Sequence, residues 1–168
     1  MPPIAHSIEI DRPPDEVFAY VSDPSRFAEW QNDVVRVRME GEPPPSVGSR
    51  FTTTRRIGRS ERTMTQQITK NNPPTSWAAR GVAGPIRPNA SILVDPIDDG
   101  TRSCVTFSLD FEGHGIGVPL VPAIRLMASR GAPKSYRNLK ERLESGEQRA
   151  RYWSREEVLS PVVPRFSR

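Results

Sequence analysis

The sequence of 168 residues is poor in cysteine and in histidine, and both shortages restrict the chemistry it can perform. Cys104 is the single cysteine, so no disulfide can form within the chain, and there is no CxxC metal pattern. The two histidines, His6 and His114, fall in different predicted elements without a cluster of carboxylates beside them. We therefore expect no metal site, and no motif suggests a cofactor.

Long apolar runs are missing as well. No stretch approaches the ~20 apolar residues that a membrane-spanning helix needs. The first residues, MPPIAHSIEID, lack the basic and then apolar pattern of a secretory signal. We therefore expect a soluble cytoplasmic protein with no integral membrane segment.

Lysine is scarce, so arginine supplies most of the positive charge. The lysines are Lys70, Lys134 and Lys140, and the net charge is +4. No basic motif with interleaved aromatic residues accompanies this charge, so we expect no nucleic-acid partner. A chain of this length is expected to form one domain that buries ~70% of its unfolded surface. Both a monomer and a homodimer remain open.

Alternation of apolar and polar residues is abundant. In residues 4–11 the side chains of Ile4, His6, Ile8 and Ile10 share one face, which is typical of a half-buried strand. The same period of two occurs at 33–41, where Val35, Val37 and Met39 are expected to face inward. It recurs at 50–57, 62–70, 77–81, around Ile92 and Val94, and at 105–111. Turns rich in proline and glycine separate these segments. The pattern predicts consecutive strands in an antiparallel sheet.

Helical signals occur after the first strand and near the end. Pro14, followed by acidic residues, and Asp23 before Pro24 predict two short helices. A spacing of three and four residues predicts a long helix over 122–145, with Gly146 as its C-cap and a bend near Pro133.

The apolar face of this long helix is uneven. Its far end carries Leu139 and Leu143, whereas small residues occupy its middle: Ala128, Gly131, Ala132 and Ser135. Small side chains do not fill the space over a curved sheet. Either the helix lies close to the sheet there, or a cavity opens between them, and the sequence leaves both possibilities open.

Four phrases, taken together and in order, carry a family resemblance. They are IEIDRPPDEVFAYVSDPSRFAEW, PPTSWAARG, DDGTRSCVTFSLDFEG and NLKERLE. They resemble the SRPBCC superfamily, in particular its polyketide cyclase/dehydrase and lipid-transport proteins. The resemblance covers residues 4–146 and implies an α+β helix-grip fold: a seven-stranded antiparallel sheet curved around a long C-terminal helix, two short helices between strands 1 and 2, and an apolar cavity. Residues 1–146 would form this domain, and 147–168 a C-terminal tail. The family has no universal catalytic motif to carry over.

Candidate ligand-binding residues follow from the faces that point toward the long helix. The polar ones are His6, Thr53, Arg55 and Gln66, and the apolar ones are Phe51, Met64, Trp77, Ile92, Phe107, Leu109, Ala128 and Ala132. A mostly apolar pocket with a few polar groups is typical of small-molecule sites. His6 could transfer protons, hold a ligand oxygen, or be a satisfied core histidine. Arg55 could pair with a ligand carboxylate or enolate, or extend to water.

Three functional hypotheses remain. The first is binding or transport of an apolar small molecule, such as a lipid or a polyketide-like compound, in an internal cavity. The second is a polyketide cyclase or dehydratase, with His6 and Arg55 as proton-transfer and oxyanion groups. The third is a protein-interaction module or toxin-like regulator that uses the tail and the arginine-rich turn at 55–62. The scarcity of ionisable candidates favours binding over catalysis.

Overall fold

The computed structural model describes residues 2–146. The tail at 147–168 lies outside the described residues, so the domain boundary drawn at Gly146 stays a prediction.

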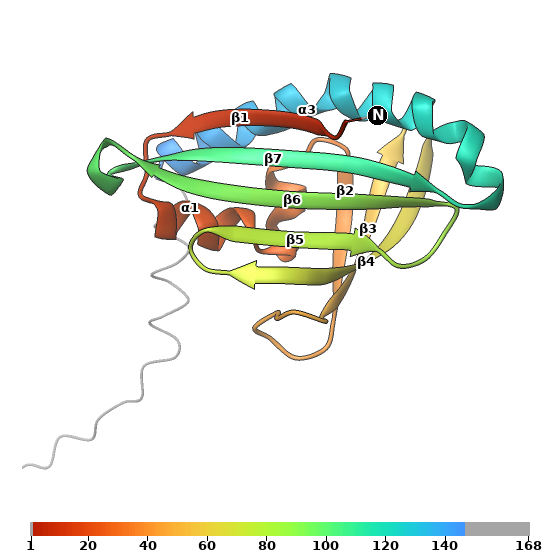
Figure 1. Ribbon diagram of the computed structural model, residues 1–168, viewed down its shortest axis with the longest axis horizontal. Coiled ribbons are helices and arrows are strands. Elements are labelled where there is room, and N and C mark those ends of the chain that lie inside the picture. The colour runs from red at the N-terminus through yellow and green to blue at the C-terminus, as the bar shows by residue number, and fades with distance from the viewer. Residues whose placement is uncertain (1, 147–168) are drawn as a thin grey trace, which may run out of the picture.

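The strands of the described residues form one antiparallel sheet in the order β1-β7-β6-β5-β4-β3-β2 (Figure 1). Their bounds are β1 Ile4–Ile10, β2 Val34–Glu40, β3 Arg50–Ile57, β4 Ser60–Asn72, β5 Ser76–Gly81, β6 Ile86–Ile97 and β7 Arg102–Gly113. Consecutive strands pair through short turns from β2 to β7, as the alternation predicted. β1 then pairs with β7, so β1 and β2 occupy opposite edges.

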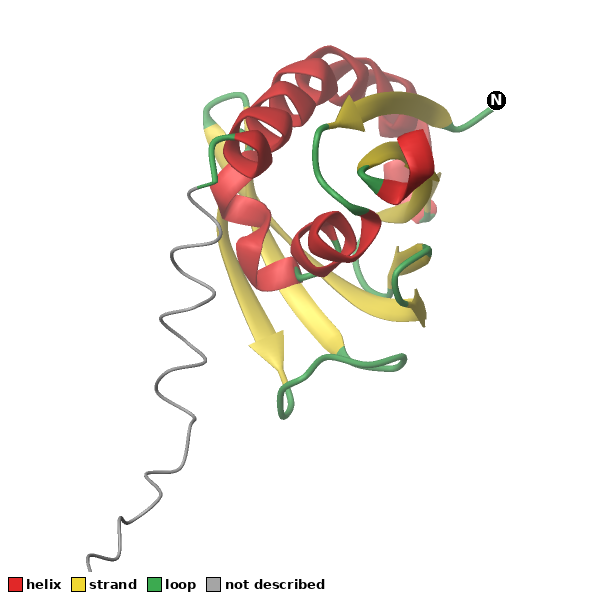
Figure 2. Cartoon of the chain, turned by 90° about the vertical axis from the view of Figure 1, so that its left-hand side faces the viewer, coloured by secondary structure: helices red, strands yellow, loops and turns green. Residues whose placement is uncertain are grey.

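The helices explain how the chain crosses from one edge of the sheet to the other. α1 (Pro14–Val21), the 3-10 turn η1 (Pro24–Arg26) and α2 (Phe27–Trp30) connect β1 to β2. The long helix α3 (Val121–Glu144) follows β7 and is continuous through Pro133. Figure 2 shows the sheet bending around this helix. This arrangement confirms the predicted α+β helix-grip fold with seven antiparallel strands.

The packed core lies beneath the C-terminal half of α3. Leu139 and Leu143 are buried there against the cluster that includes Val17, Val21 and Val105. Burying a leucine side chain contributes about 1.5–3 kcal/mol. The large residues of the predicted helix face therefore fasten this half of α3 to the sheet, and the small residues lie over the other half.

A bulge in β2 corrects one expectation about that strand. Strict alternation predicts that Val35 points inward, but its side chain is 44% exposed and Val34 is buried instead. The register with β3 shifts between Val34 and Arg36, which leaves Val35 as the extra residue. An extra residue in one strand shifts the alternation, so the residues after the bulge face opposite to what strict alternation from the residues before it would give.

The glycine-rich entry to α3 is a site of close backbone approach. The 3-10 turn η3 (Gly115–Leu120) connects β7 to α3, and η2 (Asp98–Gly100) connects β6 to β7. A Cβ atom on Gly117 would lie 1.9 Å from the carbonyl oxygen of Pro85. The backbone N–H of His114 donates to the same oxygen at 2.8 Å. Glycine at 117 thus allows η3 to dock on the β5–β6 connection and fixes where α3 begins.

None of the helices in residues 2–146 combines the length with the apolar character that crossing a bilayer requires.

Candidate ligand cavity

A cavity of about 330 Å³ lies between the N-terminal half of α3 and the concave face of the sheet. Helix α3, strands β3 to β7 and the α2–β2 connection all contribute side chains. The lining residues are Phe27, Trp30, Gln31, Asn32, Asp33, Arg55, Arg56, Ile57, Met64, Gln66, Trp77, Pro88, Ala90, Ser91, Ile92, Phe107, Ser108, Leu109, Phe111, Ile124, Met127, Ala128, Arg130, Gly131, Ala132, Lys134, Ser135 and Tyr136. Of the two alternatives that the small helix residues left open, the structure has the cavity.

Aromatic rings form much of the wall. Phe27 of α2 makes edge-to-face contacts with Trp30 and Trp77, with ring centroids 5.9 Å apart in both pairs. Trp30 in turn contacts Phe107 of β7 at 5.7 Å. Such pairs add about 0.5–1.5 kcal/mol each to the free energy gained by burial. The short α2 helix is thereby fixed against the sheet, and its aromatic side chains face the cavity.

The two tryptophans also bring buried donors to the wall. Trp30 and Trp77 are 3% and 2% exposed, and neither indole N–H has a hydrogen-bond partner within residues 2–146. A buried donor without an acceptor costs about 1–3 kcal/mol. An oxygen atom that came within reach of either nitrogen would recover part of that free energy.

Tyr136 of α3 separates the cavity from a second hollow. Its ring stacks on Phe107, with centroids 4.3 Å apart and planes 12° apart. Burial raises the pKa of Tyr136 to about 12, although the positive charge of Arg55 acts in the opposite direction. Its hydroxyl forms no hydrogen bond inside the described part of the chain. The phenol is therefore a protonated donor near Arg55 at neutral pH.

Arg55 is anchored at one side of the mouth. Its Nη1 donates to both carboxylate oxygens of Asp33, at 2.8 and 3.0 Å, and its Nη2 donates to Oε1 of Gln31 at 2.7 Å. Its side chain is 21% exposed. Arg55 therefore connects β3 to the α2–β2 connection, defined here as residues 31–33.

The same connection is fastened to α3. The backbone N–H of Asn32 donates to Oγ of Ser135 at 3.1 Å, and Nδ2 of Asn138 donates to Oδ1 of Asn32 at 2.7 Å. Ser135 is a buried polar residue on the inner face of the helix. Residues 31–33 thus connect the helix to the sheet along one side of the cavity.

Positive charge gathers where the cavity opens. Arg130 and Lys134 lie one turn apart on α3 and are exposed, and Arg55 and Arg56 extend from β3. Asp33 is the carboxylate among the described lining residues, and it is bound to Arg55. Arg56 also contacts Glu61 at 3.3 Å, but both side chains are at least half exposed. The interior is apolar and its mouth is cationic.

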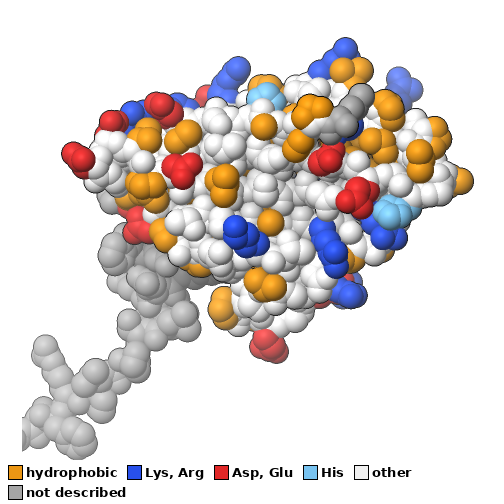
Figure 3. All heavy atoms as spheres, in the orientation of Figure 1, with side chains coloured by type: hydrophobic (Ala, Val, Ile, Leu, Met, Phe, Trp, Pro, Cys, Tyr) orange, Lys and Arg blue, Asp and Glu red, His pale blue; other side chains and the backbone are white. Residues whose placement is uncertain are grey.

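Exposed apolar side chains adjoin the mouth. Met127 both lines the cavity and is 46% exposed, and Ile116, Val118, Leu120 and Leu126 are exposed nearby on η3 and α3. Hydrophobic side chains are visible at this end of the molecule in Figure 3, to the right, with basic side chains around them. The apolar lining thus continues onto the outer surface.

The structure brings nine of the twelve candidate residues to the cavity wall. They are Arg55, Met64, Gln66, Trp77, Ile92, Phe107, Leu109, Ala128 and Ala132. Their common inward face explains this agreement: alternation assigns it to the strand residues, and the helical period assigns it to Ala128 and Ala132. That they contact a ligand stays a prediction.

His6 lies outside the cavity, in the second hollow. Together with Pro133, Arg137 and other residues it surrounds a space of about 280 Å³ on the opposite side of Tyr136. The centroids of the His6 and Tyr136 rings are 5.6 Å apart. Because β1 is an edge strand beneath the C-terminal half of α3, an inward-facing residue on it meets the helix and does not reach the cavity.

Phe51 and Thr53 also lie outside the wall, although both are fully buried. The ring of Phe27 packs edge-on against Phe51, with centroids 5.9 Å apart. Oγ1 of Thr53 accepts a hydrogen bond from Nε2 of Gln66 at 3.4 Å. Alternation predicted their inward orientation correctly, but α2 covers this part of the sheet.

Some cavity residues were missed by sequence reasoning. Tyr136, Trp30 and residues 31–33 were not among the candidates. Tyr136 follows Ser135 on the predicted inner face, so a broader apolar face would have included it. The role of residues 31–33 depends on contacts with β3 and α3, which no local pattern indicates.

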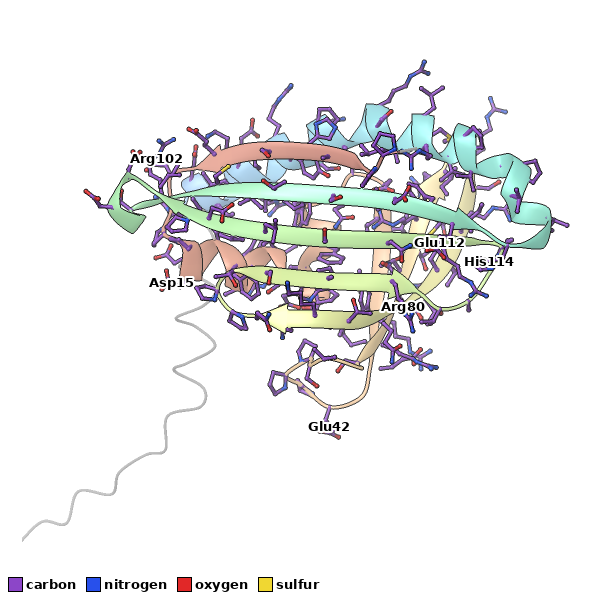
Figure 4. All side chains as sticks on the ribbon, in the orientation of Figure 1. Asp15, Glu42, Arg80, Arg102, Glu112 and His114 are labelled. Carbon is purple, nitrogen blue, oxygen red and sulfur yellow. The ribbon has the colours of Figure 1, made fainter. Side chains whose placement is uncertain are left out.

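Other ionisable residues lie away from the cavity. His114 and Glu112, labelled in Figure 4, are at the end of β7, with Nε2 and Oε2 3.7 Å apart. Asp110 forms an ion pair with Arg125 of α3. β1 reaches only as far as Leu109, so the end of β7 is accessible to the helix. No three His, Cys, Asp or Glu side chains in residues 2–146 are grouped as metal ligands.

Comparison with known proteins identifies a family model that covers nearly the whole described region. Residues 1–144 match the family described as polyketide cyclase / dehydrase and lipid transport. No curated protein matches the chain in a sequence search.

Several solved structures share the fold at low sequence identity. An aromatase/cyclase, Zhui from Streptomyces sp. R1128, has a TM-score of 0.72 at 14% identity, over 86% of this chain and 94% of that one. A START superfamily protein from Mycobacterium smegmatis has a TM-score of 0.70 at 12% identity, over 86% and 99%. The di-domain aromatase/cyclase BexL has a TM-score of 0.63 at 15% identity; the match covers 84% of this chain but 46% of BexL. At these identities the likeness shows the fold alone.

Proposed function

Because this chain belongs to the polyketide cyclase/dehydrase and lipid transport family, we propose that it binds an apolar small molecule in the cavity beneath α3. The ligand class is lipid-like or polyketide-like. The observation that carries the proposal is the cavity itself: about 330 Å³ of space between the small residues of α3 and an aromatic wall. Sites for small molecules have volumes of about 300–1,000 Å³ and are mostly apolar.

The two halves of α3 are packed differently, and this difference supports a binding cavity. Leu139 and Leu143 fasten one half of α3, so the fold does not depend on filling the other half. Protein interiors are normally close-packed, so an apolar space of this size in a stable fold favours an occupant.

The test measures uptake of a neutral fluorescent probe, N-phenylnaphthylamine, by the parent and by variants that fill the space. Ala128→Leu and Ala132→Leu place a larger side chain in the cavity, and Ala123→Leu is the control because Ala123 is exposed on the same helix. We expect the parent and the control to bind the probe and both cavity variants to lose it. The unfolding free energy of the cavity variants should fall by less than the ~1–3 kcal/mol typical of overpacked cores. No binding by the parent, together with clear destabilisation of the variants, would contradict the proposal.

A second function, polyketide cyclase or dehydratase, is favoured by one observation. Tyr136 and Arg55 lie near each other at the cavity, and the phenol is protonated at neutral pH. Both could stabilise negative charge that develops on a carbonyl oxygen of the ligand. His6 is not part of this pair, because Tyr136 lies between it and the cavity.

Turnover assays separate these two functions. The parent would be incubated with a poly-β-ketone thioester, and products would be followed by mass spectrometry. The enzymatic function requires cyclised or dehydrated product above the uncatalysed background, and a loss of that rate in Tyr136→Phe with probe binding unchanged. Equal rates with and without protein would exclude the enzymatic function for this substrate class and leave binding.

The third interpretation, a protein-interaction module or toxin-like regulator, gains no support from the cavity. The cytoplasmic location, the oligomeric state and the absence of a nucleic-acid partner stay predictions.

A further inference from the structure

The charge at the mouth of the cavity contrasts with its interior. Arg130 and Lys134 extend from α3 on the same side of the cavity, since residues four apart lie on one face of a helix. Arg56 of β3 is also a lining residue of the cavity. The walls below them are formed mainly by aromatic and aliphatic side chains.

The positive charge is largely uncompensated. Asp33, the carboxylate among the described lining residues, holds Arg55 through two hydrogen bonds. Within residues 2–146, neither Arg130 nor Lys134 forms an ion pair. The contact between Arg56 and Glu61 is an exposed one at 3.3 Å, and such pairs neutralise little of the field. Arg130 and Lys134, both exposed lining residues, therefore have no counter-charge of their own.

A cationic mouth above an apolar cavity favours a molecule that has both an anionic group and an apolar tail. A cleft with charge of a single sign and low-dielectric walls concentrates the electric field at its opening. A carboxylate or phosphate there would gain charge-assisted hydrogen bonds from arginine and lysine. An apolar tail attached to it would enter the cavity, whereas a wholly polar anion would leave the cavity unfilled.

We propose that the ligand is an anionic amphiphile. Its apolar part fills the cavity, and its carboxylate or phosphate group lies beside Arg130 and Lys134. This inference depends on the proposed binding function and specifies its ligand class.

The experiment compares two probes that differ only in charge: dansylaminoundecanoic acid and its methyl ester. We expect the acid to bind about tenfold more tightly than the ester, because hydrogen bonds to charged groups contribute more than those to neutral groups. Raising the salt concentration should reduce this preference, since exposed charges are screened. Equal affinities, or tighter binding of the ester, would overturn the proposal and leave the apolar binding function intact. If neither probe and no neutral apolar compound binds, both proposals fail.

Variants of the basic lining residues test whether the anionic group lies at the mouth. In Arg130→Gln/Lys134→Gln the affinity for the acid should fall about tenfold and that for the ester should change less than about twofold. The matched control is Arg36→Gln/Arg38→Gln, which removes the same charge from exposed positions on β2. We expect both affinities of the control to stay within about twofold of the parent. An equal loss of acid binding in both double variants would indicate a general charge effect and contradict a site at the mouth.

Competition distinguishes the source of the anion. Decanoate, decyl phosphate, decanol and inorganic phosphate would each be titrated against the bound acid probe. Displacement by decanoate at a lower concentration than decanol indicates a fatty-acid-like ligand, and the same result for decyl phosphate indicates a phospholipid-like one. Both results support the proposal. Displacement by inorganic phosphate alone would show an anion site independent of the cavity and overturn it.

Discussion

The ring of Tyr136 lies flat on the ring of Phe107, with centroids 4.3 Å apart and planes 12° apart. One ring belongs to α3 and the other to β7, so the pair joins the helix to the sheet at the inner end of the cavity. It also divides the cavity from the hollow beside His6. The position of Tyr136 therefore affects both the stability of the fold and the shape of the binding space.

Substitutions at Tyr136 test how much its ring contributes to the stability of the fold. Tyr136→Ala should lower the unfolding free energy by about 3 kcal/mol, because it removes a large buried side chain and a stacked pair. Tyr136→Phe should change it by less than about 0.5 kcal/mol, since the phenol has no hydrogen-bond partner within residues 2–146. Urea denaturation of the three proteins measures both effects. A large loss in Tyr136→Phe would show that the hydroxyl has a partner in solution.

The raised pKa of Tyr136 predicts how the stability of the fold changes at alkaline pH. Burial raises this pKa from 10.0 in the unfolded chain to about 12 in the folded protein. A group with a raised pKa contributes stability below its unfolded pKa, and this contribution decreases as pH rises from about 10 toward 12. The stability of the parent relative to Tyr136→Phe should therefore be constant from about pH 7 to 9 and decrease above pH 10. Thermal melts of both proteins across this range provide the measurement, and a constant difference would indicate a phenol exposed to water.

Local patterns were sufficient for the architecture and for most of the cavity wall. Period-two segments predicted the strands, and Ala128 and Ala132 on an otherwise apolar helix face indicated where space would open. These inferences succeed because the repeat period of a strand or helix decides which residues close in sequence share one face. They fail at Val35, where a bulge shifts the register without a clear local signal.

Positions that depend on distant segments were not predictable in the same way. His6 faces inward as expected, yet β1 lies beneath the C-terminal half of α3, and no local pattern indicates which half of the helix covers an edge strand. Phe51 is inward too, but Phe27 of α2 covers it. The Arg55–Asp33 pair joins elements 22 residues apart, and neither residue carries a pattern that identifies its partner.

The Arg55–Asp33 pair should stabilise the side of the cavity that residues 31–33 form. A double-mutant cycle with Arg55→Gln and Asp33→Asn measures the interaction between them. We expect a coupling free energy of about 1 kcal/mol, at the upper end for partly exposed pairs, because one guanidinium nitrogen contacts both carboxylate oxygens. Strictly additive effects of the two changes would show that the pair contributes nothing to stability.

Two glycines near α3 should respond to alanine in opposite directions. At Gly117 a Cβ atom would lie 1.9 Å from the carbonyl oxygen of Pro85, so Gly117→Ala must displace η3 or the β5–β6 connection. We expect the unfolding free energy to fall by about 2 kcal/mol, as for other overpacked sites, together with weaker probe binding because the start of α3 moves.

At Gly131, inside α3, a Cβ atom would meet nothing within 4 Å. Gly131→Ala should therefore raise the unfolding free energy by about 0.5–1 kcal/mol, since alanine restricts the unfolded chain and favours the helix. Chemical denaturation of both variants beside the parent tests the pair. A neutral Gly117→Ala would mean that η3 does not dock on Pro85, and a destabilising Gly131→Ala would mean that another group occupies the open space beside Gly131.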